Sequence, residues 1–183
     1  LVYWDQRLAE HGAYVTARRA LALSRLDRSS RDVHAGLTEN GGMLHLTYQP
    51  SLGAVGLEPI PSPAAGEDWE IAGPVVGEPS GAFQSGLERG RREEIVRGMT
   101  VLGPHRDDFR FLLAETDLTI YGSRGQQRTA ALALKLAETE LVRQVKGHWP
   151  VLLLDDVMSE LDGQRRNRLL TLMDGASQTL VTT

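Results

Sequence analysis

The sequence predicts an α/β fold, with a mainly helical first half and a parallel-sheet core with helices in the second half. Two observations predict the sheet. An apolar run, VLLL at 151–154, lies between two helix-like segments, and a second strand-like segment, QTLVTT, closes the chain. A short, continuously apolar strand between helices is typical of a buried strand in a parallel sheet.

The first half is expected to be mainly helical. Apolar residues recur at roughly helical spacing over residues 1–28, where Gly12 marks a potential kink. The alternating segment MLHLTY at 43–48 predicts a strand. Residues 49–82 hold six of the eight prolines and six of the nineteen glycines, which is typical of a long loop or linker. A charged helical pattern returns at 83–97.

From residue 99 the pattern becomes α/β. The expected elements are strands at 109–113 and 117–121, a helix at 126–145, the apolar strand at 151–154, a helix at 163–173 and a final strand at 178–183. We therefore divide the chain into a helical region at 1–98 and an α/β region at 99–183.

Composition excludes several classes of function. The chain has no cysteine, so disulfides, iron–sulfur clusters and thiolate zinc sites are excluded. Its five histidines are scattered without metal-ligand spacing, which favours structural or surface roles for them. The net charge is −4, so any contact with nucleic acid must come from a local basic face. No apolar run reaches the roughly 18 to 20 residues of a membrane helix.

Two carboxylates follow the apolar strand directly, in the stretch VLLLDDVMSELD at 151–162. Ligands of open α/β sheets bind at the carboxyl ends of the strands. Asp155 at that position can hold Mg²⁺, which prefers oxygen ligands and bridges to substrate phosphates, as in a Walker B motif. Asp156 is then placed to orient or deprotonate an attacking water. The alternative is that the two acids begin a turn or cap the next helix.

A polar turn, YGSRGQQR at 121–128, precedes the long Ala/Leu-rich helix. Unpaired N–H groups at the start of a helix favour an anion, and Gly125 would let a phosphate approach the backbone. Gln126 can donate through its amide, and Arg124 adds a positive charge. Ordinary N-capping by Ser123 is the alternative, and this motif alone does not decide between them.

The order of the motifs is more specific than either motif alone. S-x-G-Q, a helix, an apolar strand ending in acids, and SELD have the spacing of the second half of an ABC-type ATPase head. The chain resembles the RecF family, bacterial recombination-repair members of the SMC-like branch of ABC ATPases. The matching stretches are GPHRDDFRF, YGSRGQQRTAALALKLAE, PVLLLDDVMSELD and LVTT, while WDQRLAEHGAYVTARR and LHLTYQPS resemble the family's helical arm, or lobe II.

In this family ATP lies between two heads. The resemblance implies that Ser123, Gly125 and Gln126 contact the γ-phosphate of ATP held by the other subunit, and that Asp155 and Asp156 serve the ATP of their own subunit. It also implies that this chain has a D-loop that contacts the partner head. The D-loop residues would be Ser159, Glu160 and Asp162. Many ABC proteins place Glu where Asp156 stands, and the shorter side chain is compatible with slow, switch-like hydrolysis.

One family motif does not occur. The chain contains no G-x-x-x-x-G-K-[ST] loop, and its only two lysines lie in KLA and KGH. Without that loop the β- and γ-phosphates lack their main cradle. The chain is therefore expected to correspond to the later part of a RecF-like protein and to be inactive as an ATPase by itself.

The resemblance implies a cytoplasmic DNA-repair and replication protein with ATP and Mg²⁺ as cofactors. It would dimerise on DNA when ATP binds and would favour single-stranded gaps or duplex junctions. It would also act in the SOS response and recruit a mediator such as RecR. No membrane partner is expected. Two alternatives remain open. One is the nucleotide-binding subunit of an ABC transporter, and the other is an interaction module of the same fold that does not hydrolyse ATP.

Overall fold

The computed structural model describes residues 2–38, 41–51, 78–159, 161–173, 175 and 178–182. The chain divides into two units. Unit 1 comprises Leu1–Ser24 and Tyr48–Phe109, and unit 2 comprises Arg25–Thr47 and Arg110–Thr183. Most of the loop expected at 49–82 lies outside the described residues, as does Glu160. The predicted division between residues 98 and 99 stays a prediction.

Helix α1 (Val2–Leu37) is continuous through Gly12, so this glycine does not split the helix. In unit 1 its small residues Ala9 and Ala13 are buried against Phe83 and Leu87 of α2 (Glu78–Arg97). A Cβ added at Gly12 would lie 2.8 Å from the Phe83 ring. Gly12 therefore admits an aromatic ring at close range rather than ending the helix.

A buried carboxylate holds the rest of unit 1 together. The Asp107 side chain follows the 3₁₀ turn Pro104–Arg106 and is only 2% exposed. Its carboxylate accepts hydrogen bonds from the Tyr48 hydroxyl, from the Ser51 N–H at 2.7 Å and from the Thr16 hydroxyl at 3.3 Å. A buried charge is stable only when it is hydrogen-bonded in this way. Asp107 therefore has a structural role.

Three strands form one sheet in the order β1 (Leu44–Gln49), β2 (Asp108–Leu113) and β3 (Thr116–Asp117). Strands β2 and β3 are antiparallel. The strand expected at 117–121 is wrong beyond its first residue, because Leu118–Tyr121 form a helical turn, α3. The Asp117 carboxylate accepts the Thr119 N–H at 2.8 Å, and this N-cap starts a helix where the apolar alternation indicated a strand.

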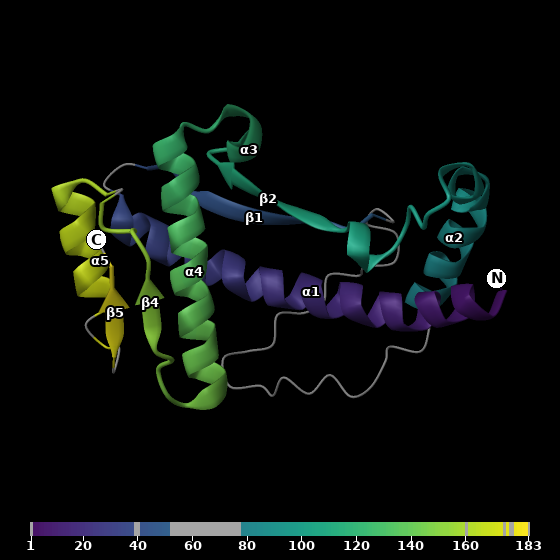
Figure 1. Cartoon of the computed structure of the whole chain (residues 1–183), viewed down its shortest axis with the longest axis horizontal. Coiled ribbons are helices and arrows are strands. Elements are labelled where there is room, and N and C mark those ends of the chain that lie inside the picture. Colours follow the sequence, from purple (N-terminus) through teal and green to yellow (C-terminus); the bar gives the residue numbers. More distant parts are fainter. Residues whose placement is uncertain are drawn as a thin grey trace. The chain divides into compact units, whose positions relative to one another are not determined.

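The second sheet lies in unit 2 and is parallel, as predicted. Strand β4 (Leu152–Leu154) pairs with β5 (Thr179–Val181), and the strands lie beside helices α4 (Arg124–Lys146) and α5 (Gly163–Leu172) (Figure 1). The helix-rich α/β fold with a small parallel sheet is therefore confirmed.

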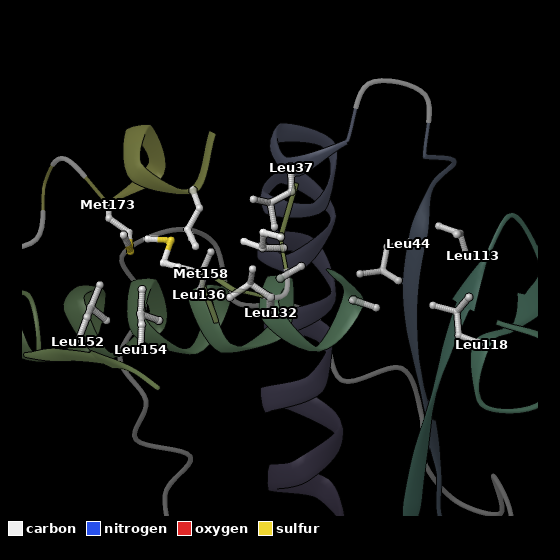
Figure 2. Packing of buried hydrophobic residues seen from close by; sticks show 14 residues of the cluster. Leu37, Leu44, Leu113, Leu118, Leu132, Leu136, Leu152, Leu154, Met158 and Met173 are labelled. Atoms are coloured by element: carbon white, nitrogen blue, oxygen red, sulfur yellow. The ribbon is translucent and has the colours of Figure 1, made fainter. Parts of the chain in front are cut away.

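The core of unit 2 gathers leucine and methionine side chains from α1, β1, β2, α4, β4 and the segment that follows β4 (Figure 2). Leu152 and Leu154 belong to it, but Leu153 is 72% exposed. The expectation that all four apolar residues at 151–154 are buried is therefore wrong. Alternate residues of a strand face opposite sides, and the described part of the chain covers only one side of β4.

The long first helix also extends further than predicted. The pattern indicated a helix to residue 28, whereas α1 ends at Leu37. Its last turns belong to unit 2, where Leu37 is 1% exposed and Gly36 lies close to the Leu172 side chain of α5. Burial in the second unit stabilises these turns, and most helical stability in proteins comes from such packing.

Candidate nucleotide-contact site

The two acids lie at the carboxyl end of β4, where they were predicted. Asp155 and Asp156 follow Leu154 directly and are both exposed. Strand β5 ends beside them, because the Thr182 N–H donates to the Leu154 carbonyl at 3.0 Å. The parallel pairing thus continues one residue beyond the strands and places Thr182 next to the acids.

The Thr182 hydroxyl connects both acids. It donates to Asp155 Oδ1 at 2.5 Å and accepts the Asp156 N–H at 3.1 Å. An ionised carboxylate can only accept, so the direction of the first bond is fixed. Bonds of this charge-assisted kind are short and strong.

Asp156 has an unusual backbone conformation. Its φ is +55°, in the left-handed region that non-glycine residues seldom adopt, although Asp and Asn tolerate it best. The Ser159 Oγ lies 2.5 Å from Asp156 Oδ1 and 2.9 Å from the Asp156 carbonyl oxygen. Ser159, the serine of the expected D-loop, is therefore hydrogen-bonded to Asp156. We call Asp155, Asp156, Ser159 and Thr182 the acid cluster.

The acid cluster fits a magnesium ion whose remaining ligands are supplied by substrate phosphates and water. Mg²⁺ is commonly held by one or two carboxylates together with waters and phosphate oxygens. Asp155 and Asp156 supply carboxylate oxygens on an exposed edge. Within the described ranges no group of three or more His, Cys, Asp or Glu residues forms a complete protein cage for a metal. The ion would thus depend on the nucleotide for the rest of its ligands.

The S-x-G-Q turn forms a capping box at the start of α4. Ser123 Oγ accepts the Gln126 N–H at 3.3 Å, and Gln126 Oε1 accepts the Ser123 N–H at 2.9 Å. The alternative of ordinary N-capping is therefore correct as a description of the local structure. The capping box uses the N–H groups of Ser123 and Gln126 and not those of Arg124 and Gly125. The latter two N–H groups could therefore donate hydrogen bonds to a bound anion.

Gly125 is not required by the packing of this chain. An added Cβ would meet the Arg165 guanidinium at 3.9 Å, which is an ordinary van der Waals distance. Residues 123–128 are all exposed. A glycine at an open helix start suits the close approach of an external group, since the fold itself does not need it.

The start of α5 is joined to α4 by one arginine. Asp162 is the N-cap of α5, and its Oδ1 accepts the Arg165 N–H at 2.8 Å. The Arg165 guanidinium lies 3.6 Å from Asp162 Oδ2 and 3.4 Å from the Thr129 hydroxyl of α4. Thr129 in turn donates to the Gly125 carbonyl at 2.8 Å. Asp162 of the expected D-loop is thus connected to the S-x-G-Q turn.

A pocket of about 340 Å³ adjoins this connection, with His34, Gln126 and Arg165 among its lining residues. His34 is buried in the last turns of α1. Burial lowers the pKa of its imidazole, and the charge of Arg165 lowers it further. His34 is therefore held neutral near physiological pH.

The described residues thus form two clusters in unit 2. The first is the acid cluster at the ends of β4 and β5, and the second is the S-x-G-Q turn with Arg165 and Asp162. Glu160, the remaining D-loop residue, lies outside the described residues.

Comparison with known proteins relates this arrangement to one family. No family model matches the chain. The DNA replication and repair protein RecF of Gloeothece citriformis is 40% identical over 183 residues, which is all of this chain and 43% of that protein. RecF of Synechocystis sp. is 42% identical over 183 residues, again with 43% of that protein covered.

All 183 residues of this chain are homologous to part of RecF.

Solved structures agree with this relationship. The structure of the recombination mediator protein RecF with ATP, in the RecFOR pathway, matches with a TM-score of 0.75 and 31% identity. That match covers 99% of this chain and 44% of the RecF chain. RecF with ATPrS matches with a TM-score of 0.75 and 32% identity. This chain spans less than half the length of the RecF relatives that it matches.

Sequence reasoning missed Thr182. LVTT was noted only as part of the resemblance, and no role was assigned to its threonines. Pairing of β4 with β5 brings this residue to acids that lie 26 and 27 positions earlier in the sequence. The usable signal was a small hydroxyl residue near the end of the strand predicted at 178–183, which was expected in the same parallel sheet as the acid-bearing strand. Within the described helices none is long and apolar enough to cross a membrane.

Proposed function

We propose that this chain forms part of a RecF-type ATPase that acts in DNA repair and replication, in which ATP joins two copies of the protein on DNA. The observation that carries the proposal is the match to RecF over the whole chain, including a RecF structure described with ATP. The geometry supports it, since the two acids are exposed at the carboxyl end of β4 and the start of α4 has room beside Gly125.

The acids of each copy serve the nucleotide bound in that copy. Asp155 would hold Mg²⁺ through its carboxylate, and Asp156 would orient the attacking water or accept its proton. When bound, Mg²⁺ supplies positive charge that neutralises the β- and γ-phosphates. Ser159 holds Asp156 in position through its hydroxyl.

The S-x-G-Q turn serves the nucleotide of the partner copy. The N–H groups of Arg124 and Gly125, together with the helix dipole, would bind the γ-phosphate. Ser123 and Gln126 keep the turn in shape through the capping box, and the Gln126 side-chain amide can also donate through its NH2 group. Ser159, Glu160 and Asp162 lie at the contact between the copies.

A Walker A loop must come from outside these 183 residues, because their sequence contains none. The exposed side of β4 supports this, since Leu153 and Val151 offer apolar surface for another part of a head to cover. We propose that the chain alone does not hydrolyse ATP. We further propose that the complete protein acts in the cytoplasm, prefers gapped or junction DNA, recruits RecR and takes part in the SOS response.

The experiment is to replace Asp156→Asn in the complete protein that carries this chain. Asn tolerates the left-handed conformation of residue 156, so the change removes charge with little backbone strain. Hydrolysis should fall at least about 100-fold, as expected for loss of a general base, while ATP-dependent dimers on gapped DNA persist. Asp32→Asn, which removes an exposed acid from α1, is the matched control.

Two outcomes decide between the proposal and its alternatives. Unchanged behaviour of Asp156→Asn in a protein that binds ATP but does not hydrolyse it would favour the interaction module. Failure of the unaltered protein to form ATP-dependent dimers on DNA would contradict the proposal itself. The match to RecF speaks against the transporter alternative.

A further inference from the structure

We propose that Thr182 is a positioning residue that fixes Asp155 and Asp156 for the metal-bound nucleotide. This inference rests on the proposed function of the two acids. It assigns a role to the end of β5, which carries none of the predicted site residues. The geometry that supports it consists of three hydrogen bonds made by this single residue.

The backbone of Thr182 is fixed first. Its N–H donates to the Leu154 carbonyl at 3.0 Å, directly after the last paired residues of the parallel strands, Leu154 and Val181. The residue is therefore held by the sheet. A side chain placed by a strand has less freedom than one placed by a loop.

The hydroxyl then uses both of its hydrogen-bonding functions. Its single proton goes to Asp155 Oδ1 at 2.5 Å, and its oxygen accepts the Asp156 N–H at 3.1 Å. A single hydroxyl can donate to the first acid and accept from the backbone of the second at the same time. Valine has nearly the same shape as threonine but can do neither.

The two bonds have different consequences. The bond to Asp155 Oδ1 fixes the plane of the carboxylate expected to hold Mg²⁺. The bond to the Asp156 N–H supports a backbone turn with φ of +55°, a conformation that non-glycine residues seldom adopt. That turn presents the Asp156 carboxylate to Ser159. Thr182 thus determines where both acids point.

The test is Mg²⁺-dependent nucleotide binding by the complete protein, measured for Thr182→Val and Thr182→Ser. The probe is a non-hydrolysable ATP analogue, titrated with Mg²⁺ and, separately, in EDTA. Partners that orient a metal ligand typically change metal affinity about 10- to 100-fold when removed. We expect a loss of that size in apparent Mg²⁺ affinity for Thr182→Val, within about threefold of the unaltered protein for Thr182→Ser, and unchanged binding of the analogue in EDTA.

Thr179→Val is the matched control. Thr179 lies on the same strand and pairs with Leu152, at the opposite end of β4 from the acids. The change is chemically the same, so Thr179→Val should retain the Mg²⁺ affinity of the unaltered protein. Equal losses in Thr179→Val and Thr182→Val would show a general effect on β5 and overturn the inference.

A double mutant separates positioning from a merely structural effect. If Thr182 acts through Asp155, adding Thr182→Val to Asp155→Asn should lower the Mg²⁺ affinity by less than about twofold further. Full additivity, or a Thr182→Val variant with unaltered Mg²⁺ affinity, would overturn the inference while leaving the proposed function intact. If the unaltered protein binds the analogue without any dependence on Mg²⁺, the proposed role of Asp155 fails and this inference fails with it.

Discussion

The Ser159 hydroxyl lies 2.5 Å from the carboxylate of Asp156, so a residue expected at a subunit contact is bonded to the residue expected to activate water. Any movement of the segment that contains Ser159 would therefore change the position of the Asp156 carboxylate. Met158 and Leu161, on either side, are buried and anchor the segment to the core of unit 2. In the proposed function this bond would connect contact with a partner to hydrolysis.

Replacement Ser159→Ala tests that connection. Loss of a hydrogen bond to a charged group should lower steady-state ATP hydrolysis by the complete protein about tenfold, because Asp156 is no longer held. Ser159→Thr keeps the hydroxyl and should retain most of the activity. Hydrolysis by Ser159→Ala at the unaltered rate would show that this bond has no role in catalysis.

Replacement Gly125→Ala tests whether the open start of α4 serves an external group. An added Cβ has room within this chain, and Ala is the better helix former, so the free energy of unfolding should fall by no more than a few tenths of a kcal/mol and could rise by up to about 1 kcal/mol. ATP-dependent dimerisation, measured by light scattering, should nevertheless weaken at least about tenfold, because the methyl group crowds the phosphate.

Gly81→Ala is the matched control for that experiment. Gly81 is also a helical glycine, and an added Cβ would meet nothing within 4 Å. It lies in α2 of unit 1, outside both clusters, so Gly81→Ala should dimerise normally. Normal dimerisation by Gly125→Ala would mean that no phosphate approaches this turn closely.

The buried Asp107 carboxylate predicts how unit 1 responds to alkaline pH. Burial, together with the hydrogen bond to Asp107, raises the pKa of Tyr48 to about 12 from its ordinary value of 10.0. A raised pKa in the folded state gives stability that is complete below pH 10 and is lost as the pH rises through 12. Denaturant unfolding should therefore show a loss of stability between pH 10 and 12 that Tyr48→Phe reduces.

At pH 8 the same replacement should lower the free energy of unfolding by about 1–3 kcal/mol, because the phenol donates to a charged, buried acceptor. Tyr14→Phe, at a partly exposed position on α1, controls for removal of a tyrosine hydroxyl. An identical alkaline loss in Tyr48→Phe and in the unaltered chain would show that Tyr48 does not carry the effect.

His34 predicts a response to acid. Burial, followed by the charge of Arg165, lowers the pKa of the imidazole below its ordinary value of 6.5. His34 therefore binds a proton more readily in the unfolded chain than in the folded chain. As the pH falls below 6.5, this difference lowers the free energy of unfolding. Comparison of urea unfolding at pH 7.5 and 5.5 should show a smaller loss for His34→Leu than for the unaltered chain, and an equal loss would contradict this.

Much of the site could be predicted from the sequence because it depends on local order. Asp155 and Asp156 follow an apolar strand, and Ser123 precedes a helix, so periodicity and capping rules were sufficient to place them. The capping box at Ser123 and Gln126 is the local alternative that the residues themselves allowed.

The remainder depends on contacts that a local pattern does not contain. Thr182 reaches the acids only because β4 and β5 pair in parallel. Leu153 looks like a buried residue in the sequence, yet the described part of the chain leaves its face of the strand exposed. The turn at Leu118–Tyr121 follows from one cap by Asp117, which outweighs the alternation of apolar residues. A strand pairing, an uncovered strand face and a helix cap thus decide these three cases, and a local pattern contains none of them.

In the proposed dimer, one site combines the acids of one copy with the S-x-G-Q turn of the other. Mixing two inactive variants of the complete protein, Gly125→Asp and Asp155→Asn, tests this arrangement. In a twofold dimer half of the molecules would be mixed, and each mixed dimer would contain one site with both elements intact. ATP hydrolysis should therefore return to about a quarter of the unaltered rate. A mixture that stays as inactive as either variant alone would show that both elements act within one copy, which would contradict the shared site.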